Sequence, residues 1–112
     1  MSTKQEVTVL LSDVIATGNG IKAAPWGSKM AFHAFGDTSA GAGAASIEIQ
    51  VSNDGTNYVV RDTLSLTLAT TIGSASQDTF VMDEPFKYVR ANVASISGTD
   101  ATVSLLMSVY RS

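Results

Sequence analysis

Apolar and polar residues alternate along most of this chain, most clearly between residues 46 and 61. Isoleucine or valine occupies every second position from Ile47 to Val51, with polar residues between them. A period of two places the apolar side chains on one face of a β-strand. Asp54-Gly55 then supplies a reversal, because both residue types tolerate left-handed backbone angles. The pattern predicts a β-hairpin whose second strand begins at Tyr58.

The same alternation predicts further strands, which cover residues 7–16, 21–24, 29–35, 64–71, 77–82, 86–96 and 101–110. Turn signals separate these segments about once per ten residues, a spacing typical of a β-sandwich or jelly roll. No segment shows a helical period. We therefore expect an all-β fold, a single antiparallel and jelly-roll-like β-sandwich of about eight strands. Greek-key and up-and-down strand orders both fit this pattern.

The strand expected at residues 29–35 has an aromatic residue on each face. Phe32 falls on one face, whereas His33 and Phe35 fall on the other. Such a strand is either covered on both sides or uses its outward face as a contact.

Two segments are expected to be flexible. Residues 1–6 are polar and predict a short N-terminal arm, followed by one β-sandwich domain over residues 7–112. Gly36–Ala45 consists mainly of Gly, Ala and Ser. A segment of this composition predicts a loop that is mobile or is ordered by a partner.

Composition narrows the possible functions of this 112-residue chain. The absence of cysteine excludes disulfides and thiolate metal sites. A net charge of -3 without a basic cluster argues against nucleic-acid binding. The polar first residues predict no signal peptide, and no apolar run approaches the ~20 residues of a membrane helix, so no membrane association is expected.

Charged residues make up 15% of the chain, against about 25% in typical domains. A partner that covers part of the surface would explain this low share. A surface solvated by serine and threonine hydroxyl groups explains it equally well.

Residues with potential chemistry are few and scattered. His33 is the only histidine and lies among apolar residues, so we expect a structural or surface role and not a metal site. Asp83 and Glu84 are adjacent, which points their carboxylates apart on an extended segment. No nucleophile elbow is present, and turn chemistry explains Asp54 without a calcium ion. We expect neither an enzyme nor a bound metal or cofactor.

Aromatic residues offer an alternative binding chemistry. Trp26, Tyr58, Tyr88 and Tyr110 could form a stacking shelf for the rings of a glycan. In the other interpretation, which we favour, Trp26 closes one end of the sandwich and the tyrosines cap strands with their hydroxyl groups in water.

Short motifs along the chain carry a resemblance to a known family. They are the Gly18-Asn19-Gly20 turn, the Ser-x-Asp-Gly hairpin from Ser52 to Tyr58, the Tyr-Val-Arg-Ala strand from Tyr88 to Ala91, and Gly-Thr-Asp-Ala-Thr-Val from Gly98 to Val103. Together they resemble the small β-sandwich virion proteins of tailed bacteriophages. These proteins serve as capsid decoration (cement) proteins or as neck and tail accessories. Tyr58 stands where the family often has Trp.

The resemblance implies a non-enzymatic structural protein of the virion, assembled in the host cytoplasm. A decoration protein would stabilise the head through contacts with the major capsid protein or other virion proteins, and would commonly form a homo-oligomer, most often a trimer. The alternatives are a glycan-binding module of a phage appendage and a ring-forming neck or tail protein. The residues expected to contact partners are Met1, Ser2, Thr3, Lys4, Gln5, Trp26, Phe35, Gly41, Ala42, Gly43 and Tyr88.

Overall fold

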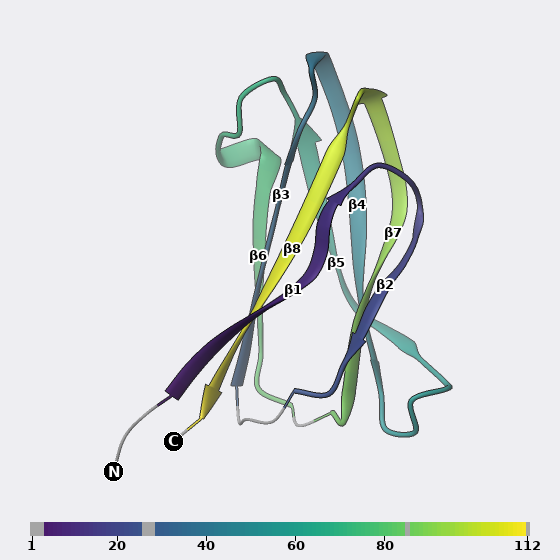
Figure 1. Cartoon of the computed structure of the whole chain (residues 1–112), viewed down its shortest axis with the longest axis vertical. Helices are drawn as coiled ribbons and strands as arrows, with labels where there is room; N and C mark the ends of the chain where they lie inside the picture. Colours follow the sequence, from purple (N-terminus) through teal and green to yellow (C-terminus); the bar gives the residue numbers. More distant parts are fainter. Residues whose placement is uncertain (1–3, 26–28, 85, 112) are drawn as a thin grey trace.

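Two four-stranded antiparallel β-sheets pack face to face (Figure 1). The computed structural model describes residues 4–25, 29–84 and 86–111. The strands are β1 (Lys4–Val14), β2 (Gly18–Ala23), β3 (Lys29–Asp37), β4 (Ala40–Ser52), β5 (Val59–Leu68), β6 (Gln77–Met82), β7 (Tyr88–Thr99) and β8 (Thr102–Arg111), with one 3-10 turn, η1 (Ser74–Ser76), before β6. Sheet A has the order β1-β8-β3-β6, and sheet B has the order β2-β7-β4-β5.

The strand order is that of a jelly roll. The antiparallel pairs β1·β8, β2·β7, β3·β6 and β4·β5 are nested, as if one long hairpin had been rolled up. Pairing of β3 with β8 and of β4 with β7 joins the nested pairs into two sheets. The predicted β-sandwich of about eight strands is confirmed, and the strand order decides between the topologies that the sequence left open.

The core lies between the two sheets and is built from the inward side chains of both. In β3, Met30, Phe32 and Ala34 are buried, while Ala31 and His33 between them are half-buried on the other face. Ile47 and Ile49 of β4 face them from sheet B and are also buried. The Phe32 ring stacks on Phe80 of β6, with the ring centroids 6.1 Å apart. The alternation predicted for these strands is therefore the alternation between core and surface.

The predicted hairpin is confirmed as β4–β5, and one carboxylate organises its turn. The Asp54 carboxylate accepts hydrogen bonds from the backbone N–H groups of Asn57 and Thr56, both at 2.8 Å, and from Asn57 Nδ2 at 2.7 Å. These bonds stabilise the charged form and hold the pKa of Asp54 well below its usual range. Gly55 adopts a left-handed φ of 77°, which the turn requires.

The loop predicted at Gly36–Ala45 is wrong, because most of this segment is strand. β3 continues to Asp37 and β4 begins at Ala40, so two residues turn the chain. A Cβ atom added at Gly43 would press against the carbonyl oxygen of Ser97 on β7. The small residues of this segment therefore let neighbouring strands approach closely.

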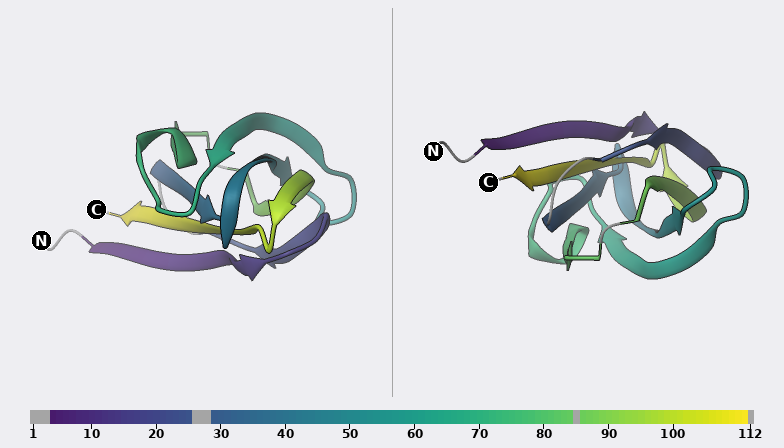
Figure 2. Two further views of the ribbon diagram at one scale, coloured as in Figure 1. Left: turned by 90° about the horizontal axis from the view of Figure 1, so that it is seen from above. Right: turned by 90° about the horizontal axis from the view of Figure 1, so that it is seen from below.

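The beginning of the chain also differs from its prediction. Whereas the sequence predicts a flexible arm over residues 1–6, β1 begins at Lys4 and pairs with β8 from Lys4↔Arg111 onward. Residues 4–6 are thus part of sheet A, and residues 1–3 lie outside the described residues. Figure 2 shows the start of β1 beside the end of β8 at one end of the molecule.

Candidate interaction faces

The outward face of sheet A carries apolar side chains from all four of its strands. We name this surface the A face; its described members are Val7, Val9, Ala31, His33, Phe35, Gln77, Thr79, Val81, Leu106 and Ser108. Val7, Val9 and Val81 are 64, 47 and 59% exposed. Apolar side chains that gather on one surface, as they do here, mark a contact site more often than scattered ones do.

Strand register aligns these side chains in rows across the sheet. The central row consists of Val9, Leu106, His33 and Thr79, from β1, β8, β3 and β6. The next row contains Val7, Ser108, Ala31 and Val81. A hollow of about 400 Å³ opens at the small Ala31 side chain, lined by Val7, Ala31, Phe32, His33, Thr79, Leu106 and Ser108.

His33 and Phe35 lie together on the outward side of β3, with their ring centroids 5.3 Å apart. His33 Nε2 lies 2.8 Å from Gln77 Oε1 on β6, a hydrogen bond that orients the imidazole across the strand pair. The sequence places Phe35 on the outward face of β3, and the structure confirms that position.

Charged residues of β3 lie only at its two ends. Lys29 and Asp37 share the outward side with His33, because all are separated by an even number of residues. The Asp37 carboxylate accepts a hydrogen bond from Thr102 Oγ1 at 3.0 Å. These two charges are about 27 Å apart along an extended strand. The A-face side chains named above include no Asp, Glu, Lys or Arg. The exposed residue Asp13 borders this face, because its backbone N–H donates to Ser104 Oγ, level with Phe35.

An ion pair joins β5 of sheet B to the segment that follows β6 of sheet A. Arg61 Nε and Nη2 donate to the two Glu84 carboxylate oxygens at 2.6 and 2.9 Å. The bonds raise the pKa of Arg61 and lower the pKa of Glu84. Asp62 and Asp83 add weaker effects in the same direction on the Arg61 pKa.

Polar side chains on the outward face of sheet B form hydrogen bonds with one another. Arg90 Nε donates to Gln50 Oε1 at 2.7 Å. Gln50 Nε2 and Asn92 Nδ2 donate to Glu48 Oε1 at 3.0 and 2.9 Å. The two outward faces of the sandwich therefore differ: sheet A presents apolar side chains from all four strands, whereas the centre of sheet B is covered by a hydrogen-bonded polar network, with the exposed Val60 at its side.

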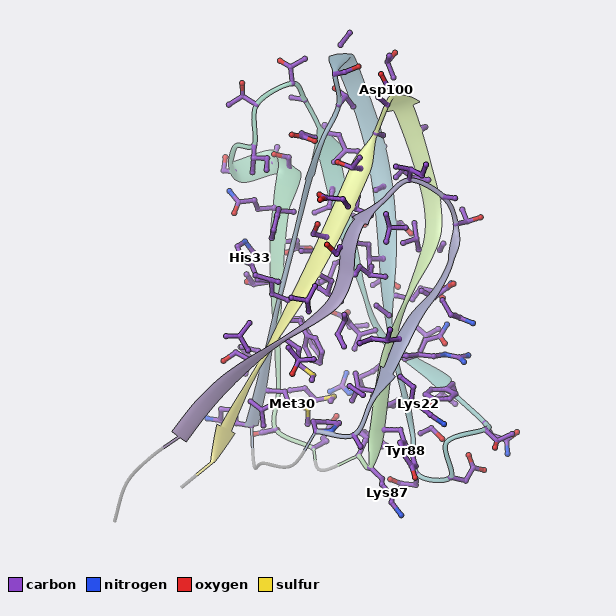
Figure 3. All side chains as sticks on the ribbon, in the orientation of Figure 1. Lys22, Met30, His33, Lys87, Tyr88 and Asp100 are labelled. Atoms are coloured by element: carbon purple, nitrogen blue, oxygen red, sulfur yellow. The ribbon has the colours of Figure 1, made fainter. Side chains whose placement is uncertain are left out.

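Two of the tyrosines in the alternative glycan shelf lie against cationic side chains. The Arg90 guanidinium lies 3.9 Å from the Tyr58 ring centroid. Lys22 Nζ and Lys87 Nζ lie 5.2 and 5.6 Å from the Tyr88 ring centroid, and Figure 3 shows these three residues gathered at one end of sheet B. These cation–π contacts do not favour the glycan shelf. The Trp26 side chain and the Tyr110 side chain lie outside the described part of the structure.

The residues predicted to contact partners do not converge on one site. Gly41, Ala42 and Gly43 follow Ala40, the first residue of β4, at the end of the sandwich where Ser39 Oγ donates to Asp100 Oδ2 at 2.9 Å. Tyr88 begins β7 at the opposite end, as the labels in Figure 3 show. Lys4 and Gln5 begin β1. Met1, Ser2, Thr3 and Trp26 lie outside the described residues.

The sequence reading missed most of the A face. Simple alternation puts Val7 and Val9 on one face with Leu11, which is buried. It gives no reason to expect Val81 or Leu106 to form an outward apolar surface. These strands carry apolar residues at both odd-numbered and even-numbered positions. That pattern predicts a strand with two apolar faces and could have indicated the A face.

Where the structure describes the chain, no group of three His, Asp or Glu side chains comes together as a metal site would require. Within the same residues, no helix is long and apolar enough to cross a membrane.

The fold was compared with those of known proteins. No family model matches this chain, and no curated protein matches it. Among solved structures, a similar one is the crystal structure of SPBc2 prophage-derived protein YomS, with a TM-score of 0.63. The alignment covers 98% of this chain and 96% of that chain at 11% sequence identity. The two proteins share a fold. At this identity the likeness extends to the whole β-sandwich and to nothing finer.

Proposed function

We propose that this chain is a non-enzymatic virion protein of a bacteriophage, and that it decorates and stabilises the capsid through protein–protein contacts. The observation that carries the proposal is the A face, where six apolar side chains lie among four polar ones and no Asp, Glu, Lys or Arg is a member. Such a surface suits burial against protein. Few ions need to be desolvated when such a surface is covered. The prophage origin of a protein with the same fold supports the phage setting.

A decoration protein needs contact area and not a reactive centre. The jelly roll supplies two broad faces and two loop-bearing ends, and many weak contacts repeated on a symmetric shell give avidity. The predicted contact residues at the start of β4, at the start of β7 and on β3 lie on different sides of the molecule. A protein that bridges several neighbours on a shell would use contacts distributed in this way.

The proposal is tested by removing the gene from the phage or prophage that encodes the chain. We expect particles to assemble but to release their DNA at a lower temperature than wild-type particles, because contacts across the capsid joints are missing. Adding the purified protein back should restore the release temperature. If wild-type particles contain the protein and particles made without it release their DNA at the same temperature, a stabilising role is contradicted.

A further inference from the structure

We infer that the A face binds a second copy of this chain, with a two-fold axis that lies in the interface and crosses the strands at the central row. The inference rests on the proposed function only for its setting in the virion. It adds the identity of the partner that covers the A face. Face-to-face packing of two sheets, about 10 Å apart, is a common way to bury such a surface.

The charges at the two ends of β3 select the direction of packing. If two A faces packed with their β3 strands parallel, Lys29 would face Lys29 and Asp37 would face Asp37 of the second copy. If the strands run antiparallel, each Lys29 faces Asp37 of the second copy. Opposite charges attract where like charges repel, so the antiparallel arrangement is favoured. Asp83 continues β6 beyond Met82, the partner of Met30, and so adds a carboxylate near Lys29 at the same end. The antiparallel arrangement still separates the two Asp37 carboxylates, which the parallel arrangement would bring together.

The shape of the A face is complementary to itself in the same arrangement. His33 is the midpoint between Lys29 and Asp37, four residues from each. Rotation about an axis at His33 therefore places Phe35 of one copy opposite Ala31 of the other. The hollow of about 400 Å³ extends from the Ala31 row to Leu106, His33 and Thr79 of the central row, and the Phe35 ring lies against His33. A large side chain thus meets a hollow twice, once on each side of the axis.

The central row faces its own copy across the axis. Val9 meets Val9 and Leu106 meets Leu106, so apolar side chains from β1 and β8 are covered by identical ones. Such an isologous contact requires a surface that is complementary to itself about one point. A different partner places no such requirement on the positions of Lys29, Ala31, Phe35 and Asp37. The A face therefore favours a pair of copies, whereas the family resemblance implied a trimer.

The native mass of the purified full-length chain, measured by light scattering after size exclusion at micromolar concentration, tests this inference. We expect twice the chain mass. Leu106→Glu places two carboxylates against each other on the axis and should raise the dissociation constant on the order of 100-fold, because a buried charge is left unpaired. Lys29→Asp and Asp37→Lys should each weaken the pair about tenfold, and the double variant should restore it.

Lys87→Asp is the matched control, since it makes the same charge change just before β7, away from the A face, and should leave the mass unchanged. Circular dichroism checks that each variant is folded. If Asp37→Lys disturbs the fold by removing the hydrogen bond from Thr102, the test depends on Leu106→Glu instead. A wild-type mass of one chain or of three overturns the two-fold pair, as does a Leu106→Glu mass equal to that of the wild type. Because these results concern the free protein, they are distinct from a failure of the virion assays, which would overturn the proposed function alone.

Discussion

Replacing Phe32 with alanine is expected to lower the free energy of unfolding by about 3–5 kcal/mol, the usual cost of deleting a buried ring. Phe32 is fully buried in β3, a strand paired on both sides, and its ring stacks on Phe80. Neighbouring side chains belong to paired strands and can close only part of the resulting cavity. Urea unfolding followed by circular dichroism measures the change.

Val59→Ala is the control for Phe32→Ala, because Val59 is 64% exposed on β5. Its removal should change the unfolding free energy by less than about 0.5 kcal/mol. Equal losses for the two variants would mean that the inward face of β3 is not the core of this protein.

Replacing Gly36 with alanine is expected to cost about 2–3 kcal/mol, although it adds only one methyl group. A Cβ atom at this position would press against the carbonyl oxygen of Thr102 and lie 2.9 Å from Val103 Cγ1 and 3.1 Å from Leu68 Cδ2. The backbone oxygen belongs to β8, which pairs with β3 here and cannot withdraw without breaking the register. The same unfolding measurement gives the loss.

Gly73→Ala is the matched control for this substitution. An added Cβ at Gly73 has no atom within 4 Å, and its φ of -131° suits any residue. We expect this variant to be as stable as the wild type or slightly more stable, because alanine restricts the unfolded chain. A harmless Gly36→Ala substitution would support the loop that the sequence predicted, and would contradict the strand seen in the structure.

The sequence predicted correctly those strands that have one buried face and one exposed face. In β4, Ile47, Ile49 and Val51 are all buried, and the Asp54-Gly55 turn follows as expected. The outward position of Phe35 was predicted for the same reason. Local patterns suffice here, because side-chain direction depends only on parity within the strand.

The A face could not be predicted in full, because it depends on features that the sequence does not mark. The register of β1 against β8 shifts between Val9 and Leu11, so that Leu10 and Leu11 are both buried while Val7 and Val9 face outward. A shift of one residue exchanges the faces of a strand. The rows that join Val9 to Leu106 and His33 also depend on strand order, which alternation alone left open.

The beginning of β4 was missed for a different reason. Gly41, Ala42 and Gly43 have low β-propensity and resemble a loop when they are read alone. In the folded chain they lie beside β7, and the approach at Gly43 leaves no space for a larger side chain. Tertiary packing thus selects small residues at this point, and composition cannot distinguish that cause from mobility.

The most direct test of the virion assignment is quantitative mass spectrometry of purified particles from the phage or prophage that encodes the chain. A capsid decoration protein should be present in a constant and high ratio to the major capsid protein, and it should stay with the particles through a density gradient. A low and fixed copy number per particle would indicate a neck or tail protein instead of a capsid decoration protein. Its absence from intact particles, while it is abundant in the lysate, would contradict the proposed function.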